Sequence, residues 1–212
     1  NLFVVLLVMA PSYLEVGASG KPGAVQSGLA AVAQARESGM RTFVVVASGS
    51  RAAIDRAEAR ALGAYEFIGK PLNVTDVHRV LDAYQRIKTQ TVALLIDDSG
   101  TARKLMGRIF DRSIFSVHIE EAAAGIEGLE RFARAPCDFV FIDLNMPGLD
   151  GASTARILRA FSDKVKIVLV SADASGLAHV KGSFTLQKPF TPRQLDGLLH
   201  ELYGLKHPSL ES

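Results

Sequence analysis

The chain has 212 residues, of which 48% are apolar, and a formal net charge of only +2. This length suits one large domain or two small ones, each able to bury a core. The weak charge argues against nucleic acid or a membrane surface as a partner, and the single cysteine, Cys137, excludes an intrachain disulfide. A lone thiol fits a reducing compartment, so we expect a cytoplasmic protein.

The chain opens on a very apolar run over residues 1–10. This run lacks the basic start of a signal peptide, and it is half as long as the roughly 20 residues of a membrane span. A continuous Val/Leu run is typical of a buried parallel strand. Because the first residue is not Met, we expect the chain to begin inside a domain, through truncation or disorder.

Short apolar runs alternate with helical patterns as far as residue 88. The Gly-, Ser- and Pro-rich segment Pro11–Gly28 predicts a loop. Strands are predicted at Phe3–Val8, Thr42–Val46 and Tyr65–Ile68, and helices at Leu29–Glu37, Arg51–Leu62 and Val74–Ile87.

The same alternation then restarts. Strands are predicted at Val92–Ile96, Ser116–Ile119, Phe139–Ile142, Lys166–Val170 and Phe184–Leu186. Ser99 is predicted to cap a helix that runs to about Phe110, and further helices are predicted at Gly125–Arg134, Ala152–Phe161 and Pro192–Leu202. Alternation of this kind predicts an α/β fold with a mostly parallel, doubly wound sheet that helices cover on both faces.

Two pairs of segments indicate an internal repeat. Phe3–Pro11 is similar to Phe139–Pro147, and Phe67–Pro71 is similar to Thr185–Pro189. Two copies of one unit explain both pairs, and the first copy begins at what would be its third strand.

The joint between the two copies lies near Lys88–Thr91 and contains hardly any linker. We therefore expect one domain over residues 1–88 and a second over residues 91–204. So short a joint favours close docking of the two domains.

Polar residues follow the strands of the second unit where each strand ends. Asp97 and Asp98 end its first strand, and later strands end at Asp143, Ser171 and Lys188. Because ligands bind at the carboxyl ends of parallel strands, we expect these side chains in one crevice. Three carboxylates repel one another unless a cation lies among them, and oxygen ligands favour Mg²⁺. One carboxylate can then attack phosphorus while a hydroxyl and an ammonium hold the phosphoryl oxygens.

Each of these features alone has a simpler explanation. A pair such as Asp97-Asp98 is often a helix cap or a solvated turn, and Asp143 alone fits a turn before Pro147. Lys188 alone fits an ordinary loop. Their conjunction at successive strand ends favours phosphoryl transfer over these alternatives.

Residues 92–204 resemble the receiver domain of response regulators in two-component signalling. The resemblance covers the whole second unit and implies a flavodoxin-like fold with strand order 2-1-3-4-5. The matching segments are Leu94–Ser99, Phe141–Gly151, Val170–Ala172 and Lys188–Phe190.

The resemblance also implies roles for the acidic residues. Asp143 would accept a phosphoryl group from a phosphohistidine on a histidine kinase or a phosphotransfer protein. Asp97 and Asp98 would bind Mg²⁺, Asp98 more directly. Asp143 and the backbone carbonyl of Asn145 would complete the protein ligands of the metal.

By the same resemblance, Ser171 and Lys188 would contact the phosphoryl group. The bond between Lys188 and Pro189 would be cis. Asn145 and Asp173 would flank the path of the attacking water, where the family sets the rate of dephosphorylation.

Two features depart from the family. The aromatic switch residue that usually lies three positions before the lysine is replaced by Thr185, with Phe184 beside it. The segment from Ser171 to Lys188 is also shorter than usual, by about one helical turn. We therefore expect a short or irregular fourth helix and a switch coupling that differs from the usual one.

The first unit keeps little of this chemistry. Its alignment with the second unit places Leu7 at the position of Asp143 and Ala47 at that of Ser171, while Lys70 is retained. We interpret this unit as a degenerate receiver that is not phosphorylated and that serves docking or dimerisation.

The predicted first strand would lie bare at one edge of the first unit, because the strand that pairs with it in the complete fold is missing. Such an edge promotes aggregation. We expect an N-terminal part, a swapped partner or a neighbouring molecule to cover it.

Three classes of function compete. The first class is a signalling receiver, which catalyses only its own phosphorylation and dephosphorylation. In that case the chain would be the tail of a hybrid histidine kinase or part of a receiver–receiver–effector protein. An aspartate-nucleophile phosphatase is disfavoured, because Asn145 stands where such enzymes usually carry a second Asp. An inactive structural adaptor is disfavoured by the intact set of polar residues at the strand ends.

The receiver interpretation fixes the expected cofactor and partners. The cofactor is Mg²⁺. The partners are a histidine kinase or phosphotransfer protein, a downstream protein or effector domain outside this chain, and a second copy in a homodimer. Neither nucleic acid nor a membrane is expected as a partner, and the chain is not expected to be a turnover enzyme.

Overall fold

A computed structural model describes residues 5–9, 32–34, 37, 43–48, 53–173, 175–176, 184–206 and 208. The chain forms two compact units that divide between Tyr84 and Gln85, inside a helix. In the described part of the chain, no helix is both long and apolar enough to cross a membrane.

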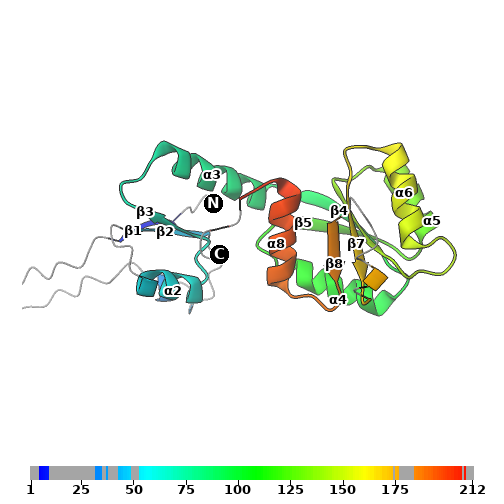
Figure 1. Ribbon diagram of the computed structural model, residues 1–212, viewed down its shortest axis with the longest axis horizontal. Helices are drawn as coiled ribbons and strands as arrows, with labels where there is room; N and C mark the ends of the chain where they lie inside the picture. Colours follow the sequence, from blue (N-terminus) through cyan, green and yellow to red (C-terminus); the bar gives the residue numbers. More distant parts are fainter. Residues whose placement is uncertain are drawn as a thin grey trace, which may run out of the picture. The chain divides into compact units, whose positions relative to one another are not determined.

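The first unit is a parallel three-stranded sheet in the order β1-β2-β3, with α2 and α3 on opposite sides of it (Figure 1). Its elements are β1 (Val5–Met9), β2 (Val44–Ser48), α2 (Ala53–Ala61), β3 (Glu66–Gly69) and α3 (Val74–Lys88). Of the helix predicted at Leu29–Glu37, residues 32–34 and 37 are described and are helical. The predicted loop Pro11–Gly28 lies outside the described residues.

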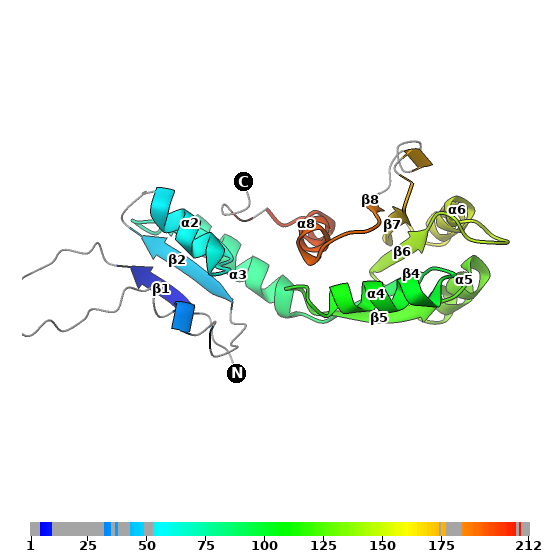
Figure 2. The same ribbon diagram turned by 90° about the horizontal axis from the view of Figure 1, so that it is seen from below.

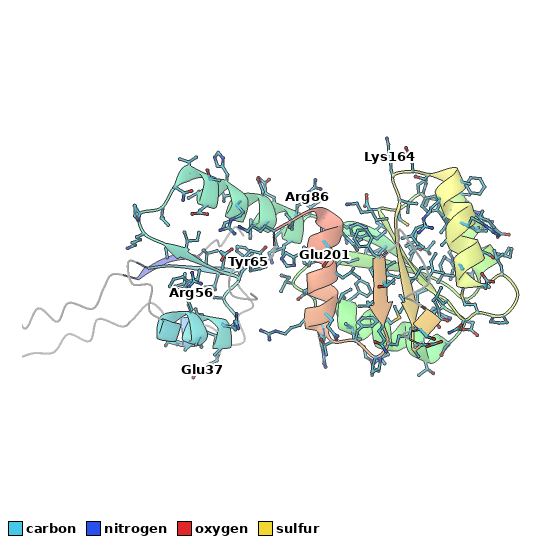
Figure 3. The ribbon with its side chains drawn as sticks, in the orientation of Figure 1. Glu37, Arg56, Tyr65, Arg86, Lys164 and Glu201 are labelled. Carbon is cyan, nitrogen blue, oxygen red and sulfur yellow. The ribbon has the colours of Figure 1, made fainter. Side chains whose placement is uncertain are left out.

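Aromatic and charged side chains hold the first unit together. The rings of Phe43 and Tyr65 lie 4.5 Å apart, and the guanidinium of Arg56 lies 5.2 Å from the ring centre of Phe67. Figure 3 labels Tyr65 and Arg56 in this unit. Val44, Val46, Ala59 and Phe67 belong to its buried core. The carboxylate of Glu66 is fully buried on β3 and forms an ion pair with Arg79 of α3.

The second unit contains every strand and helix that the sequence predicted for it, apart from the fourth-helix region. Most bounds agree within about a residue; β5 extends three residues further than predicted. The elements are β4 (Thr91–Ile96), α4 (Gly100–Phe110), β5 (Val117–Ala122), α5 (Gly125–Arg134), β6 (Phe139–Asp143), α6 (Gly151–Phe161), β7 (Lys166–Ser171), β8 (Phe184–Gln187) and α8 (Pro192–Tyr203).

The strands of the second unit are all parallel and lie in the order β5-β4-β6-β7-β8. This confirms the flavodoxin-like order 2-1-3-4-5. Helices α5 and α6 lie together on one face of the sheet and α4 and α8 on the other (Figures 1 and 2). All five residues of β6 are buried, as continuous apolar runs require when helices cover both faces.

Polar caps fix where several helices of the second unit begin. The hydroxyl of Ser99 accepts a hydrogen bond from the amide of Ala102, as the sequence predicted for α4. The carboxylate of Asp150 accepts one from the amide of Ser153 at the start of α6. Helix α8 starts with a reciprocal capping box and ends at Gly204, whose φ of 68° suits a residue without a Cβ.

The Lys188–Pro189 bond is cis, as the resemblance implied, and so is the Lys70–Pro71 bond. The prediction of a short or irregular fourth helix concerns the segment after Ser171, and residues 177–183 of that segment lie outside the described residues. Strand β1 pairs with β2 on one edge. What covers its other edge stays a prediction.

A comparison of the two units by sheet register differs by one residue from the comparison by sequence similarity. Counted from the lysine that follows the last strand, the residue at the position of Ser171 is Ser48 rather than Ala47. The residue at the position of Asp143 is correspondingly Val8 rather than Leu7. The sequence match was anchored on Phe and Pro residues, whereas backbone hydrogen bonds set the register. Either register puts an apolar residue at that position.

Candidate functional site

Asp143 is the last residue of β6, and its carboxylate lies at the carboxyl end of the sheet. The residue is 8% exposed. Its Oδ2 accepts a hydrogen bond from the amide of Asn145 at 2.9 Å, and its Oδ1 accepts one from the ammonium of Lys188 at 2.7 Å. Both carboxylate oxygens are therefore held in place by donors from two different loops.

Asp97 follows the neighbouring strand, β4, and is still more deeply buried, at 2% exposure. Its Oδ1 accepts a hydrogen bond from the amide of Ser99 at 2.8 Å, and its Oδ2 accepts one from Lys188 at 2.5 Å. Asp97 and Asp143 thus share one ammonium group.

Lys188 supplies the positive charge that allows two buried carboxylates to lie together. Burial alone would lower the pKa of its ammonium, but the hydrogen bonds and charges of Asp143 and Asp97 outweigh that effect and raise the pKa above its usual value. The amide of Lys188 also donates to the carbonyl of Ser171 at 2.8 Å, which fixes the lysine beside the end of β7.

Ser171 ends β7 and is completely buried. Its hydroxyl accepts hydrogen bonds from the amide of Asp173 at 3.0 Å and from the side-chain amide of Asn145 at 3.4 Å. The structure therefore connects Ser171, through Asn145, to the loop that holds Asp143. Asn145 and Asp173, which the sequence placed along the water path, both contact this hydroxyl.

Asp98 is the one acidic residue of the predicted set that does not join this cluster. It is exposed, and its carboxylate makes no hydrogen bond to the described residues. In the described part of the chain, no group of three or more His, Cys, Asp or Glu side chains is gathered closely enough to hold a metal ion. The expected convergence of three carboxylates is therefore reduced here to two carboxylates and a lysine.

The donor set nevertheless fits Mg²⁺ in its chemistry. Asp97 and Asp143 lie close enough to contact one cation, Asp98 directly follows Asp97, and every nearby donor in the set is oxygen. Mg²⁺ prefers oxygen ligands and accepts a site with few protein groups, because it keeps several waters.

Sequence reasoning missed one pair of residues beside the site. The guanidinium of Arg103, on α4, donates to the backbone carbonyl of Asp97 at 2.6 Å and to the carboxylate of Glu121, on β5, at 2.8 Å. The helical position of Arg103, one turn after the N-cap Ser99, was the available signal. The sequence alone gave no reason to choose it over its exposed basic neighbours.

Residues 93–200 match the family model described as "Response regulator receiver domain". That match covers half of the chain, and the chain therefore belongs to the response regulator receiver family. The family match confirms the resemblance for the second unit and does not extend to the first.

Individual relatives match the same region. The terminal-differentiation specific adenylate cyclase of Dictyostelium discoideum is 32% identical over 125 residues, covering 53% of this chain and 6% of that protein. The transcriptional regulatory protein ResD of Bacillus subtilis (strain 168) is 29% identical over 111 residues, covering 50% of this chain and 45% of that protein. The matched segment thus spans less than half of either relative.

Among solved structures, a putative response regulator from Chloroflexus aurantiacus J-10-fl superposes with a TM-score of 0.50 and 22% identity. The superposition covers 55% of this chain and 99% of that one. At this level of identity the likeness shows the fold of the second unit.

Proposed function

We propose that the second unit is a phosphoacceptor switch of two-component signalling and that Asp143 is the residue that accepts the phosphoryl group. The observation that carries the proposal is the buried Asp97–Lys188–Asp143 cluster at the carboxyl ends of β4 and β6. Membership of the receiver family supports this chemistry over an ordinary ion pair.

In the proposed reaction, an oxygen of Asp143 attacks the phosphorus of a phosphohistidine. The new O–P bond forms as the P–N bond breaks, and the imidazole departs with the electron pair of that bond. The product is an acyl phosphate on Asp143. The donor protein is a histidine kinase or a phosphotransfer protein.

The surrounding residues supply charge and orientation. The ammonium of Lys188 already donates a hydrogen bond to Asp143. From this position it would also donate to an oxygen of a phosphoryl group bound to Asp143. The buried hydroxyl of Ser171 accepts hydrogen bonds from Asn145 and Asp173 through its lone pairs and would donate its own hydrogen to a second phosphoryl oxygen. When Mg²⁺ is bound by Asp97, Asp98, Asp143 and the carbonyl of Asn145, it would offset the negative charge of the phosphoryl group.

Return to the resting state requires hydrolysis. Water attacks the phosphorus, the acyl O–P bond breaks, inorganic phosphate leaves and the carboxylate of Asp143 is restored. Asn145 and Asp173 lie at the hydroxyl of Ser171 and would line the approach of this water. The chain then acts on itself and is not a turnover enzyme.

We further propose that the first unit, over residues 1–88, is a degenerate receiver that docks a partner, a second copy or an effector outside this chain, and that the phosphoacceptor domain spans residues 91–204. In the first unit, the parallel strands β1, β2 and β3 are followed by Lys70. In the second unit, the parallel strands β6, β7 and β8 are followed in the same way by Lys188. No carboxylate ends β1, so this unit would bind without accepting a phosphoryl group.

The test is intact mass after incubation with Mg²⁺ and acetyl phosphate, on the wild type and on Asp143→Asn. The wild type should gain the mass of one phosphoryl group, and removal of Mg²⁺ with EDTA should abolish the gain, because the reaction needs the metal to offset charge. Asp138→Asn, in the loop before β6, is the matched control and should still be modified. Equal modification of Asp143→Asn and the wild type would overturn the proposal.

A further inference from the structure

The guanidinium of Arg103 connects the acidic pair to the edge of the sheet. One terminal nitrogen donates to the carbonyl of Asp97 at 2.6 Å, and Nε donates to the carboxylate of Glu121 at 2.8 Å. The Arg103 side chain is 18% exposed, against 47% for Glu121. Arg103 is therefore more deeply buried than an ordinary surface arginine, and its planar fork serves two acceptors at fixed positions.

These contacts complete the anchoring of the backbone at Asp97. Its amide donates to the carbonyl of Ala122, the last residue of β5, at 3.1 Å. Its carbonyl accepts from Arg103, and its side chain is held by Ser99 and Lys188. The peptide that follows Asp97 is thus fixed in orientation by a charge-assisted hydrogen bond to its carbonyl oxygen.

The side chain of the next residue, Asp98, is not held by hydrogen bonds in this way. Its carboxylate makes no hydrogen bond within the described part of the chain, and the residue is exposed. The direction in which it projects therefore depends on the peptide between Asp97 and Asp98, whose carbonyl oxygen Arg103 holds.

We propose that Arg103, oriented by Glu121, is a positioning residue: it holds the peptide between Asp97 and Asp98 in the orientation in which this acidic pair binds Mg²⁺. The inference rests on the proposed function, since it assumes that this acidic pair binds the metal. Glu121 acts only through Arg103: it fixes the guanidinium plane, and the guanidinium fixes the peptide. Residues that orient ligands in this way change metal affinity about 10- to 100-fold when removed.

Simple electrostatics predicts the opposite sign. Arg103 is a cation near two carboxylates, so replacing it with a neutral residue would strengthen the binding of another cation if charge alone mattered. Positioning predicts that the same replacement weakens Mg²⁺ binding. The direction of the change therefore distinguishes the two roles.

The experiment is calorimetric titration of the 212-residue chain with MgCl₂, using the wild type, Arg103→Met and Arg103→Lys. Arg103→Met should weaken Mg²⁺ binding about tenfold. Arg103→Lys keeps the charge but cannot donate in a fork to both the carbonyl of Asp97 and Glu121, so it should also weaken binding. Arg108→Met, which removes an exposed charge from the same helix, should leave the affinity unchanged or slightly higher.

A double variant tests the order of action. Because Glu121 acts through Arg103, Arg103→Met/Glu121→Gln should bind Mg²⁺ as weakly as Arg103→Met alone. Circular dichroism of each variant checks that the fold is retained; if Arg103→Met does not fold, Arg103→Lys carries the test. Affinity in both Arg103 variants equal to or tighter than that of the wild type would overturn the inference alone. A wild type that binds no Mg²⁺ would overturn the proposed metal site and this inference together.

Discussion

The environment of Lys188 suits its proposed role in binding phosphoryl oxygens. Its ammonium touches two buried carboxylates, so its pKa is raised and it stays charged through the whole neutral range. For a lysine with a raised pKa, the stabilising effect is complete below the unfolded value and is lost as pH rises through the folded one. The cluster should therefore persist into alkaline solution, beyond the ordinary lysine value of 10.5.

Cys137 provides a test of burial at the opposite end of the second unit's sheet. Burial raises the pKa of its thiol to about 11, and the thiol donates to the carbonyl of Phe139 at 3.2 Å. Cys137 is partly buried and packs against the core of the second unit. Only the thiolate reacts with alkylating reagents, so Cys137 should be nearly inert at neutral pH.

We expect the rate of alkylation by iodoacetamide to rise about tenfold per pH unit from pH 8 to pH 10, because the thiolate fraction rises in that proportion below the pKa. Free cysteine, with a pKa of about 8.5, is the reference, and its rate should level off above about pH 9. A plateau for Cys137 at the same pH as free cysteine would contradict this environment. Circular dichroism at pH 10 verifies that the protein is still folded.

At the level of elements, helix α6 packs unusually closely behind the Asp143 loop. Its first residue, Gly151, donates from its amide to the carbonyl of Leu144, and a Cβ at this position would lie 2.1 Å from the carbonyl oxygen of Asp143. Backbone atoms cannot move aside as a flexible side chain can. The glycine is therefore needed where the helix meets the end of β6.

Gly151→Ala should destabilise the protein by about 1–3 kcal/mol, the usual cost of overpacking, because α6 must shift away from the Asp143 loop. Gly107→Ala on α4 is the matched control, since a Cβ there meets nothing within 4 Å. It should stabilise the protein by about 0.5–1 kcal/mol through helix propensity. Urea unfolding curves compare the two, and similar effects of both substitutions would contradict the close packing.

The elements of the second unit were predictable because their signals are local. Apolar runs bounded by turn residues gave its strands, and Ser99 gave the start of α4. The order of the strands came from resemblance and is confirmed. The sequence match that sets Leu7 against Asp143 and Ala47 against Ser171 differs by one residue from a match by sheet register, because side-chain similarity does not report which backbone groups pair.

The site was predictable as a set of residues but not as an arrangement. Its residues follow strands in the sequence, so their placement at one edge of the sheet followed from topology. The sequence could not show that Lys188 bridges Asp97 and Asp143 or that Asp98 is exposed and stays outside their hydrogen bonds. Nor could it select Arg103, whose contacts with Asp97 and Glu121 depend on the pairing of β4 with β5.

In the molecule as a whole, the chain combines a receiver domain with a smaller parallel unit. The matched relatives carry receiver segments within proteins of other overall design, as their names, a cyclase and a transcriptional regulator, indicate. The receiver unit supplies the proposed phosphorylation chemistry. The proposed output is a change of partner, mediated by the first unit or by a region outside this chain.

The proposed function requires that Asp143, and no other carboxylate of the cluster, carries the phosphoryl group. The most direct measurement is treatment of the phosphorylated protein with borohydride, which reduces an aspartyl phosphate to homoserine and releases phosphate, followed by peptide mass spectrometry. We expect homoserine at position 143, with Asp97 and Asp98 unchanged. Homoserine at position 97 or 98, or an intact phosphate on a serine after reduction, would contradict it.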